Sequence, residues 1–285
     1  MSNNVTVLLK VAEKRLAEAG VPSPRYDAEA LLDDLLGSPT ARHLTPTVSP
    51  EVFADYLRLV ERRADREPLQ HILGSAGFRR LELRIGAGVF VPRPETERLV
   101  EWGLAVLAGQ DSPVVVDLCA GSGAIALSIA DEHDTALVYA VEQAPAALEW
   151  LARNAEPYDR VTVVPGDATD PAVLSTVDGT ANLVLTNPPY VPDGTPLPPE
   201  VGRYDPPEAL WGGPDGLTVV RKVLATAARM LRPGGWVGLE HAEVHAPAVL
   251  RLVAGAGFDH ATTHPDLTGR PRFTVGRRGV HRSTQ

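Results

Sequence analysis

The stretch that decides the fold is Val114–Ala126, which reads VVVDLCAGSGAIA. An apolar run ending at Asp117 predicts a buried strand, and the apolar residues after Gly123 predict a helix. Gly121 and Gly123 permit a turn too tight for larger residues, which brings backbone N–H groups and the helix N-terminus close to a polar ligand. The segment therefore predicts the first strand, turn and helix of an open α/β sheet.

Strand and helix patterns alternate from Val114 onward. This alternation predicts a doubly wound, largely parallel sheet that binds ligands at the carboxyl ends of its strands. The predicted strands are Val114–Leu118, Ala136–Glu142, Val161–Pro165, Asn182–Thr186, Trp236–Glu240 and Arg272–Gly276. The predicted helices between them are Ala124–Asp131, Pro145–Asn154, Leu217–Leu231 and Val244–Ala256.

The residues before this sheet have a different pattern. Apolar positions at three- and four-residue spacing predict a helix that ends at Gly20, followed by helices over Asp27–Leu36 and Pro50–Ala64. Leu81–Val91 alternates around two glycines, which predicts a β-hairpin, and the following PRPETE suits the start of a helix. We therefore expect a helical domain at 1–75, a linker with the hairpin at 76–92, and a Rossmann-like domain at 93–285.

The composition is that of a water-soluble globular protein, with 44% apolar and 22% charged residues among 285. Its one cysteine excludes an internal disulfide framework, and the charged residues among the first twenty argue against a secretory signal. The net charge of −9 falls entirely on the residues after position 80. An acidic body is a poor match for nucleic acid, so we expect a cytoplasmic protein with neither a membrane nor a direct nucleic-acid partner.

Three acids follow successive predicted strands. Asp117 precedes the glycine turn, and Glu142 ends the next strand, where it could accept hydrogen bonds from ribose hydroxyls. This pairing favours S-adenosylmethionine, although nicotinamide-binding domains use a similar turn and a turn without any ligand is also possible. Asp167 is expected at the adenine pocket, with a helix cap as the alternative.

Thr186-Asn187-Pro188-Pro189-Tyr190 follows the apolar strand NLVLT directly. Two prolines remove two N–H donors and leave a rim of acceptors. The Asn187 side-chain oxygen and the Pro188 carbonyl are expected to accept both hydrogens of an NH₂ group, while Tyr190 offers a flat face for stacking. The residues therefore predict methylation of a planar amide or amine nitrogen.

Other interpretations of this loop remain open. It could be only a rigid Pro-Pro turn, or the pocket of an adenine- or amine-directed nucleic-acid methyltransferase. A nicotinamide-dependent oxidoreductase has no use for an acceptor rim. A non-catalytic module that keeps the fold is disfavoured by the intact Asn187 and glycine turn.

The chain resembles the bacterial protein-(glutamine-N5) methyltransferases that modify peptide chain release factors. The resemblance covers nearly the whole chain and rests on these segments: PRYDAEALL, EPLQHILG, FVPRPETERLVE, DLCAGSGAIALSIA, LTNPPYVP, GGPDGL, LRPGGW and DLTGRPRFTVGRR. NPPY is shared with other amine methyltransferases, whereas PRPETE with a small N-terminal helical domain is more specific.

The resemblance implies a class I S-adenosylmethionine methyltransferase acting on the glutamine of a Gly-Gly-Gln loop in class I release factors, which the helical domain helps to dock. It implies that Asn187, Pro188 and Tyr190 are catalytic, that Pro189 completes the glutamine pocket, and that no metal takes part. The implied cofactor-binding residues are Asp117, Cys119, Ala120, Gly121, Ser122, Gly123, Glu142, Asp167, Ala168 and Asn187. The chain departs from the family at Cys119 (usually Gly), Glu142 (usually Asp) and Ala168 (often aromatic).

Three further features carry predictions of their own. Glu240, His241, Glu243 and His245 resemble a metal site but lack an evident third ligand. The arginines at 270, 272, 277 and 278 are expected on a solvated edge strand, with an RNA or partner contact as the alternative. The Pro-rich stretch from 191 to 207 is longer than a connection requires, which suggests a loop facing the substrate.

Overall fold

The computed structural model describes residues 3–280, and they form two compact units. The helical unit contains the described residues up to Ser75 together with Leu197–Tyr204. The catalytic unit contains Ala76–Pro196 and the described residues from Asp205 onward. The chain therefore leaves the catalytic unit after Pro196, adds one short helix to the helical unit, and returns at Asp205.

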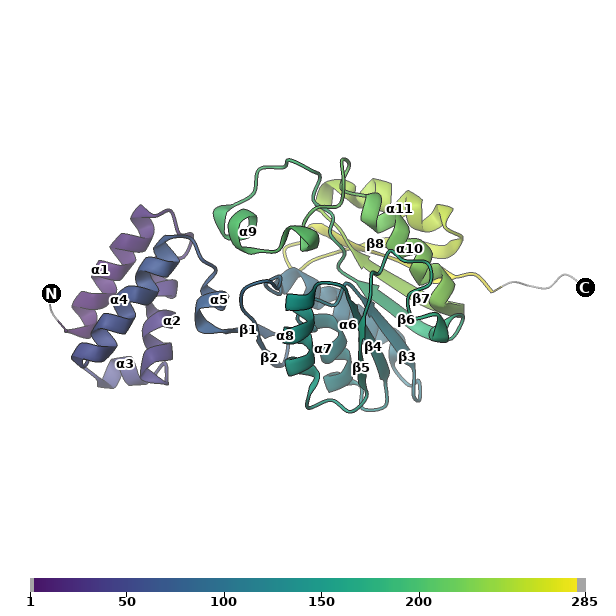
Figure 1. Cartoon of the computed structure of the whole chain (residues 1–285). Helices are drawn as coiled ribbons and strands as arrows, with labels where there is room; N and C mark the ends of the chain where they lie inside the picture. Colours follow the sequence, from purple (N-terminus) through teal and green to yellow (C-terminus); the bar gives the residue numbers. More distant parts are fainter. Residues whose placement is uncertain (1–2, 281–285) are drawn as a thin grey trace, which may run out of the picture. The chain divides into compact units, whose positions relative to one another are not determined.

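The helical unit is a small bundle with its own apolar core (Figure 1). Leu16, Leu31 and Leu32 are fully buried in it, and the buried Tyr56 hydroxyl donates to the Ala28 carbonyl at 3.0 Å. Three of its helices were predicted, one of which starts earlier than expected because Pro24 suits a first helical turn. Its helices are α1 (Val5–Glu18), α2 (Pro24–Leu36), α3 (Ala41–Leu44), α4 (Pro50–Ala64), α5 (Leu69–Leu73) and α9 (Pro199–Tyr204).

Helix α9 is attached to the rest of the helical unit by ion pairs. Glu200 accepts hydrogen bonds from Arg63 at 3.0 Å and from Arg66 at 2.6 Å. Arg63 is buried and also donates to Asp27 at 2.6 Å. Burial by itself would raise the pKa of the Glu200 carboxyl. The hydrogen bonds from Arg66 and Arg63 together have the larger effect, so the pKa of this carboxyl is lowered.

The catalytic unit is built on a seven-stranded sheet in the order β5-β4-β3-β6-β7-β9-β8, of which β3 to β7 are parallel (Figure 1). This confirms the predicted doubly wound sheet. The chain switches sides of the sheet between β3 and β6, which is where such folds bind ligands. The strands are β3 (Val114–Leu118), β4 (Leu137–Glu142), β5 (Val161–Pro165), β6 (Ala181–Thr186), β7 (Leu231–Glu240), β8 (Phe258–Pro265) and β9 (Pro271–Arg278).

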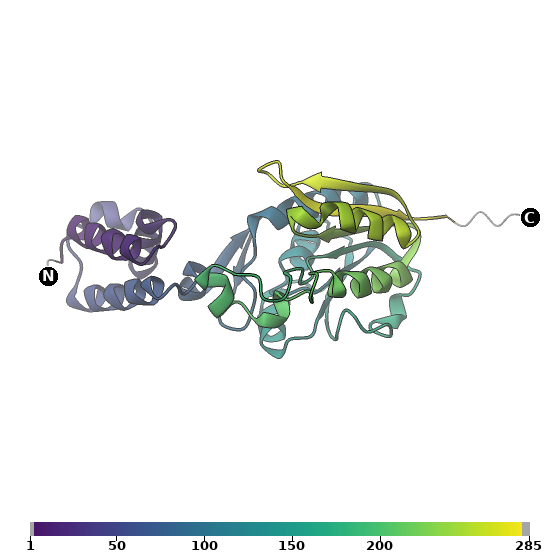
Figure 2. The ribbon, with the colours of Figure 1, turned by 90° about the horizontal axis from the view of Figure 1, so that it is seen from above.

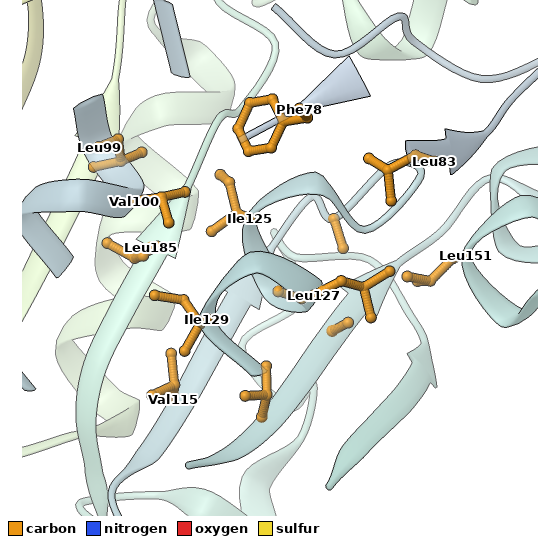
Figure 3. Close-up of a cluster of buried hydrophobic side chains, with 14 of the residues drawn as sticks. Phe78, Leu83, Leu99, Val100, Val115, Ile125, Leu127, Ile129, Leu151 and Leu185 are labelled. Atoms are coloured by element: carbon orange, nitrogen blue, oxygen red, sulfur yellow. The ribbon is translucent and has the colours of Figure 1, made fainter. Parts of the chain in front are cut away.

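Helices cover both faces of this sheet, and the strand residues alternate between two cores. Val115 and Leu185 pack with one set of helices (Figure 3), and Leu183 belongs to the same core, whereas Val116 and Val184 pack with the other set. This alternation follows the two-residue period of a strand and gives each face its own apolar layer. The first set is α6 (Glu97–Leu107), α7 (Ala124–Glu132) and α8 (Pro145–Ala155), and the second is α10 (Thr218–Met230) and α11 (Ala246–Gly255).

The prediction that the arginines near the C-terminus occupy an edge strand is wrong. Arg272, Arg277 and Arg278 lie on β9, which pairs antiparallel with β7 on one side and β8 on the other (Figure 2), and Arg270 directly precedes this strand. The edge strand on this side of the sheet is β8, which was not predicted from the sequence because FDHATTHP has no clear apolar alternation. Arg272 is consequently not on a solvated edge and donates to Asp266 at 3.2 Å.

The small β-hairpin exists, but its predicted position is wrong. Its strands are β1 (Ser75–Phe78) and β2 (Leu81–Arg84), joined through Arg79 and Arg80. The two glycines that suggested the turn instead let the following loop pass close to α8. A Cβ atom on Gly86 would lie 2.6 Å from Trp150, and one on Gly88 would lie 2.6 Å from Ala146.

Within residues 3–280, none of the helices has both the length and the apolar character needed to span a bilayer.

Candidate active site

The glycine turn after β3 needs its glycines for two different reasons. Gly123 has φ +94°, and a Cβ atom there would lie 2.8 Å from both Leu127 and Leu151, so packing and backbone both exclude a side chain. Gly121 has φ +56°, but a Cβ atom there would meet no atom within 4 Å. The turn is therefore packed against the protein at Gly123 and open at Gly121, where a ligand can approach the backbone.

Cys119 opens the same turn in a left-handed conformation, with φ +67°. Glycine adopts this conformation without strain, which explains why the resembling family usually has glycine there. Burial raises the pKa of the Cys119 thiol, so the group stays neutral and is a poor nucleophile. Its place in the turn is thus structural.

Asp117 provides a buried polar group beneath the turn. Its Oδ2 atom accepts a hydrogen bond from the Ala126 backbone at 3.0 Å, which ties β3 to the first turn of α7. Its Oδ1 atom has no hydrogen-bond partner among residues 3–280. Burial raises the pKa of this carboxyl well above its usual range. An unpartnered buried oxygen beside an open turn fits a polar ligand such as S-adenosylmethionine.

Glu142 ends β4 and braces the glycine turn from the side. Its carboxylate accepts hydrogen bonds from the backbone N–H groups of Gly121 at 2.9 Å and of Gln143 and Ala144 at 2.8 Å. The longer side chain, where Asp is usual in the resembling family, is thereby held against the turn. A carboxylate has about four lone-pair positions. The three backbone N–H groups occupy three of them, so one remains for a ribose hydroxyl.

The third predicted acid lies nearby but is satisfied locally. The Glu142 carbonyl accepts from the Gly166 backbone at 2.9 Å, which places Asp167 and Ala168 beside the end of β4. The Asp167 carboxylate accepts from the backbone and hydroxyl of Thr169 at 2.8 and 2.9 Å. Its side chain therefore closes a turn, and its place at an adenine pocket stays a prediction.

The Asn-Pro-Pro-Tyr loop lies next to the glycine turn because their strands are neighbours. Leu118 of β3 pairs with Thr186 of β6, and the Thr186 hydroxyl donates to the Leu118 carbonyl at 2.6 Å. Asn187 follows at once and is half-buried, while Pro188 and Pro189 are buried. The cofactor residues and the loop thus meet at the switch point of the sheet.

Two residues that the sequence analysis did not assign to the site hold this loop. Thr96 accepts a hydrogen bond from Asn187 Nδ2 at 3.3 Å and donates to Glu240 Oε2 at 2.7 Å. The Tyr190 hydroxyl donates to Glu240 Oε1 at 3.2 Å. Burial raises the pKa of Glu240 to about 7. The only available signal was that Glu240 ends a predicted strand beside the loop.

The glycine-rich segment GGPDGL supports the loop from behind. The Gly212 backbone donates to the Val191 carbonyl at 2.8 Å. A Cβ atom on Gly216 would lie 2.5 Å from the Tyr190 carbonyl, so only glycine permits this approach.

The metal-like cluster is not assembled. Glu240 contacts Thr96 and Tyr190, whereas the His241 ring lies 2.9 Å from the Ala242 carbonyl and 2.8 Å from the Thr274 hydroxyl. In the part of the chain from 3 to 280, no group of three or more His, Cys, Asp or Glu side chains is arranged to hold a metal ion.

A doubly wound sheet with an acid and a glycine turn after its first strand, an acid at the end of the second and Asn-Pro-Pro-Tyr after the fourth defines an S-adenosylmethionine-dependent methyltransferase. Family models agree: residues 8–74 match the PrmC N-terminal domain and residues 99–196 match the methyltransferase small domain. The hMettl16 catalytic domain shares the fold, with a TM-score of 0.54 at 14% identity over 71% of this chain and 77% of that one.

Two relatives are similar over almost their whole length. A release factor glutamine methyltransferase from Mycolicibacterium smegmatis is 45% identical, covering 95% of this chain and 96% of that protein. One from Streptomyces coelicolor is 46% identical, covering 94% of this chain and 96% of that protein. The chain belongs to the release factor glutamine methyltransferases, and its methyl donor is S-adenosylmethionine.

Proposed function

We propose that this enzyme methylates the side-chain amide nitrogen (N5) of the glutamine in the Gly-Gly-Gln motif of class I peptide chain release factors. The observation that carries the proposal is a pair of free acceptors on the loop after β6. Within residues 3–280, neither Asn187 Oδ1 nor the Pro188 carbonyl accepts a hydrogen bond. An amide NH₂ group has two hydrogens to offer to such a pair. The names of the relatives support release factors as the proteins that carry the glutamine.

The reaction depends more on how the substrate amide nitrogen is oriented than on a strong general base. An amide nitrogen is a weak nucleophile because its lone pair is delocalised into the carbonyl. Acceptors at Asn187 and Pro188 hold both hydrogens, which directs the lone pair and favours a less planar nitrogen. S-adenosylmethionine supplies, when bound, a methyl group on a positively charged sulfur. Fixing the nitrogen in line with that methyl group supplies much of the rate gain.

Tyr190 completes the proposed glutamine pocket. Burial raises the pKa of its hydroxyl, so the group stays protonated and keeps donating to Glu240. A ring anchored at its hydroxyl presents a fixed flat face, against which a planar amide can stack.

The helical unit is part of the proposal as the docking surface for the release factor. It carries an open groove of about 750 Å³ with leucine, isoleucine and charged side chains along it. Mixed apolar and charged linings suit a protein partner better than a phosphate backbone. The groove is lined by Asp34, Leu35, Asp55, Leu57, Arg58, Leu59, Glu61, Arg62 and Ile72.

A cytoplasmic location and the absence of a direct nucleic-acid partner complete the proposal. Release factors act on ribosomes in the cytoplasm, and the whole net charge of −9 lies beyond position 80. An acidic catalytic unit disfavours contact with phosphates.

Transfer of a labelled methyl group from S-adenosylmethionine tests this function. The enzyme is incubated with a class I release factor, with the same factor carrying asparagine for the Gly-Gly-Gln glutamine, and with duplex DNA and RNA. We expect label on the unmodified factor alone. Equal labelling of the asparagine variant, or labelling of nucleic acid in place of the factor, would contradict the proposal.

A further inference from the structure

Thr96 lies between two side chains of the site and contacts both. Its hydroxyl oxygen is 2.7 Å from Glu240 Oε2 and 3.3 Å from Asn187 Nδ2. Thr96 is 3% exposed and Glu240 is 1% exposed, so water does not compete for these bonds. The three residues come from the segment before α6, the loop after β6 and the end of β7, and they converge at one point.

The direction of these hydrogen bonds follows from the number of hydrogens available. An ionised carboxylate only accepts, and a threonine hydroxyl has a single hydrogen. When Thr96 donates that hydrogen to Glu240, it has only lone pairs left for Asn187. The side-chain amide of Asn187 must then turn its Nδ2 group toward Thr96, which leaves Oδ1 on the side away from Thr96.

A neutral group at position 240 removes this constraint. A protonated carboxyl or a glutamine amide can donate to Thr96, and the Thr96 hydrogen is then free to point at Asn187. The amide of Asn187 can now rotate so that its oxygen faces Thr96 and its NH₂ group faces the substrate. Two NH₂ groups facing each other cannot form a hydrogen bond, so the rotated amide does not bind the substrate nitrogen.

We propose that Glu240 is a positioning residue that acts through Thr96 to hold the oxygen of the Asn187 amide toward the substrate. The same carboxylate receives the Tyr190 hydroxyl at 3.2 Å and so holds both sides of the loop. This inference rests on the proposed function of Asn187 as an acceptor for the glutamine amide.

The surroundings of Glu240 make the device sensitive to pH. Burial raises its pKa to about 7, against the opposing effects of Thr96, the Arg272 guanidinium on β9 and Tyr190, while Glu95 adds a second nearby negative charge. Arg272 stays charged and Tyr190 stays protonated near neutral pH. The ionised form predominates above about pH 7 and is lost as the pH falls through that value, so the oriented state of Asn187 is lost with it.

Single-turnover methylation of a release factor across this pH range tests the inference with the full-length enzyme. We expect Glu240→Gln to lower the rate about 10- to 100-fold above neutral pH, by analogy with residues that orient the side chains binding a metal ion. We also expect the wild-type rate to fall on acidification and the variant to lose this fall. Calorimetry should give an unchanged affinity for S-adenosylmethionine.

The matched control is Glu132→Gln, which neutralises a partly buried acid elsewhere in the same unit. Glu132 ends α7 and pairs with Arg79 at 2.6 Å, away from the loop. It should keep both the rate and the pH profile of the wild type.

Thr96 offers a second test that does not require changing the charge. Thr96→Ser keeps the hydroxyl and should stay close to the wild-type rate, whereas Thr96→Val removes it and should fall toward Glu240→Gln. The double variant with Thr96→Val and Glu240→Gln should have a rate only slightly lower than that of either single variant, because both changes disrupt the same hydrogen-bonded path from position 240 through Thr96 to Asn187.

The outcomes separate this inference from the proposed function. If the wild type methylates the release factor and a folded Glu240→Gln enzyme keeps its rate and its acidic fall, the positioning role is wrong. Full activity of Thr96→Val would contradict it equally. If the wild type itself does not label the glutamine, the proposed function fails instead.

Discussion

The cofactor side of the active site is held through backbone N–H donors at most 21 positions from the acids that accept from them, whereas the substrate side is held by side chains much farther away in the sequence. The carboxylates of Glu142 and Asp117 accept hydrogen bonds from backbone N–H groups, those of Gly121, Gln143 and Ala144 for Glu142 and that of Ala126 for Asp117. Asn187 and Tyr190 are held by the side chains of Thr96 and Glu240, which lie 91 and 50 positions away. A backbone N–H donor remains when its own side chain is changed, unless the new residue is proline. A hydrogen bond between two side chains is lost when either residue is replaced.

The largest expected effect on the substrate side is that of Asn187→Ala. It removes one acceptor of the substrate amide and leaves the Pro188-Pro189 turn in place. Loss of one preorganised hydrogen-bonding group typically lowers kcat about 10²–10³-fold, or roughly 3–4 kcal/mol. Single-turnover methyl transfer would measure it, with circular dichroism as the check on folding. Near wild-type turnover of a folded variant would mean that Asn187 is not the acceptor.

On the cofactor side, Gly123→Ala should act on stability. Its methyl group would overlap Leu127 and Leu151 at 2.8 Å, and its φ of +94° disfavours any side chain. Overpacking and backbone strain together should lower the free energy of unfolding by about 2–4 kcal/mol. Gly121→Ala is the matched control, because its added Cβ atom would have no other atom within 4 Å. This variant should lower the free energy of unfolding by only about 1 kcal/mol. Equal losses in urea unfolding would contradict the distinction between the two glycines.

The loop that starts at Asn187 continues into the helical unit, where its support is again remote in sequence. Glu200→Gln weakens the contacts with Arg63 and Arg66 and should lower the stability of the helical unit by about 1–2 kcal/mol. Because the pKa of Glu200 is lowered in the folded state, this contribution is present above its unfolded pKa and is lost as the pH falls through its folded pKa.

Glu61→Gln is the control for this change, since its pair with Arg15 is exposed at both ends and contributes little. Hydrogen exchange of the helical unit at neutral and acidic pH would compare the two variants. A Glu200→Gln effect no larger than that of Glu61→Gln would show that α9 is not held by these ion pairs.

The smallest effect is expected at Cys119. Its left-handed conformation strains any residue but glycine by about 1–2 kcal/mol, while glycine loses about 0.5–1 kcal/mol through its greater freedom when unfolded. Cys119→Gly should therefore raise the free energy of unfolding by about 1 kcal/mol or less. Thermal unfolding would detect this, and a clear destabilisation would show that the thiol contributes packing that outweighs the strain.

The same contrast explains how much the sequence predicted. The glycine turn, Glu142 and the loop after β6 were recognisable because each is a short pattern at the end of a strand. Thr96 was visible only as part of a helix start, and Glu240 only as the end of a predicted strand and a member of the metal-like cluster, because nothing local places them together. Their meeting depends on the pairing of β6 with β7 and on the position of α6.

The elements that were missed have a related cause. Strand β8 carries polar residues along most of its length, and its place in the sheet depends on the antiparallel ladder with β9. The hairpin was misplaced because Gly86 and Gly88 are required by close approach to α8, a contact between distant residues. Helix α9 is a six-residue element within a Pro-rich stretch, and its partners Arg63 and Arg66 lie more than a hundred positions earlier.

Identification of the labelled product tests the central claim most directly. A release factor methylated with isotopically labelled S-adenosylmethionine is isolated, its labelled peptide is located by tandem mass spectrometry, and the peptide is hydrolysed in acid. Hydrolysis of an N-methylated side-chain amide releases methylamine, whereas a methyl ester releases methanol and a carbon-bound methyl group stays on the amino acid. We predict that the label lies in the Gly-Gly-Gln peptide and is recovered as methylamine. Label recovered as methanol, or retained on a residue other than that glutamine, would contradict the account of Asn187 and Pro188 as acceptors for a glutamine amide.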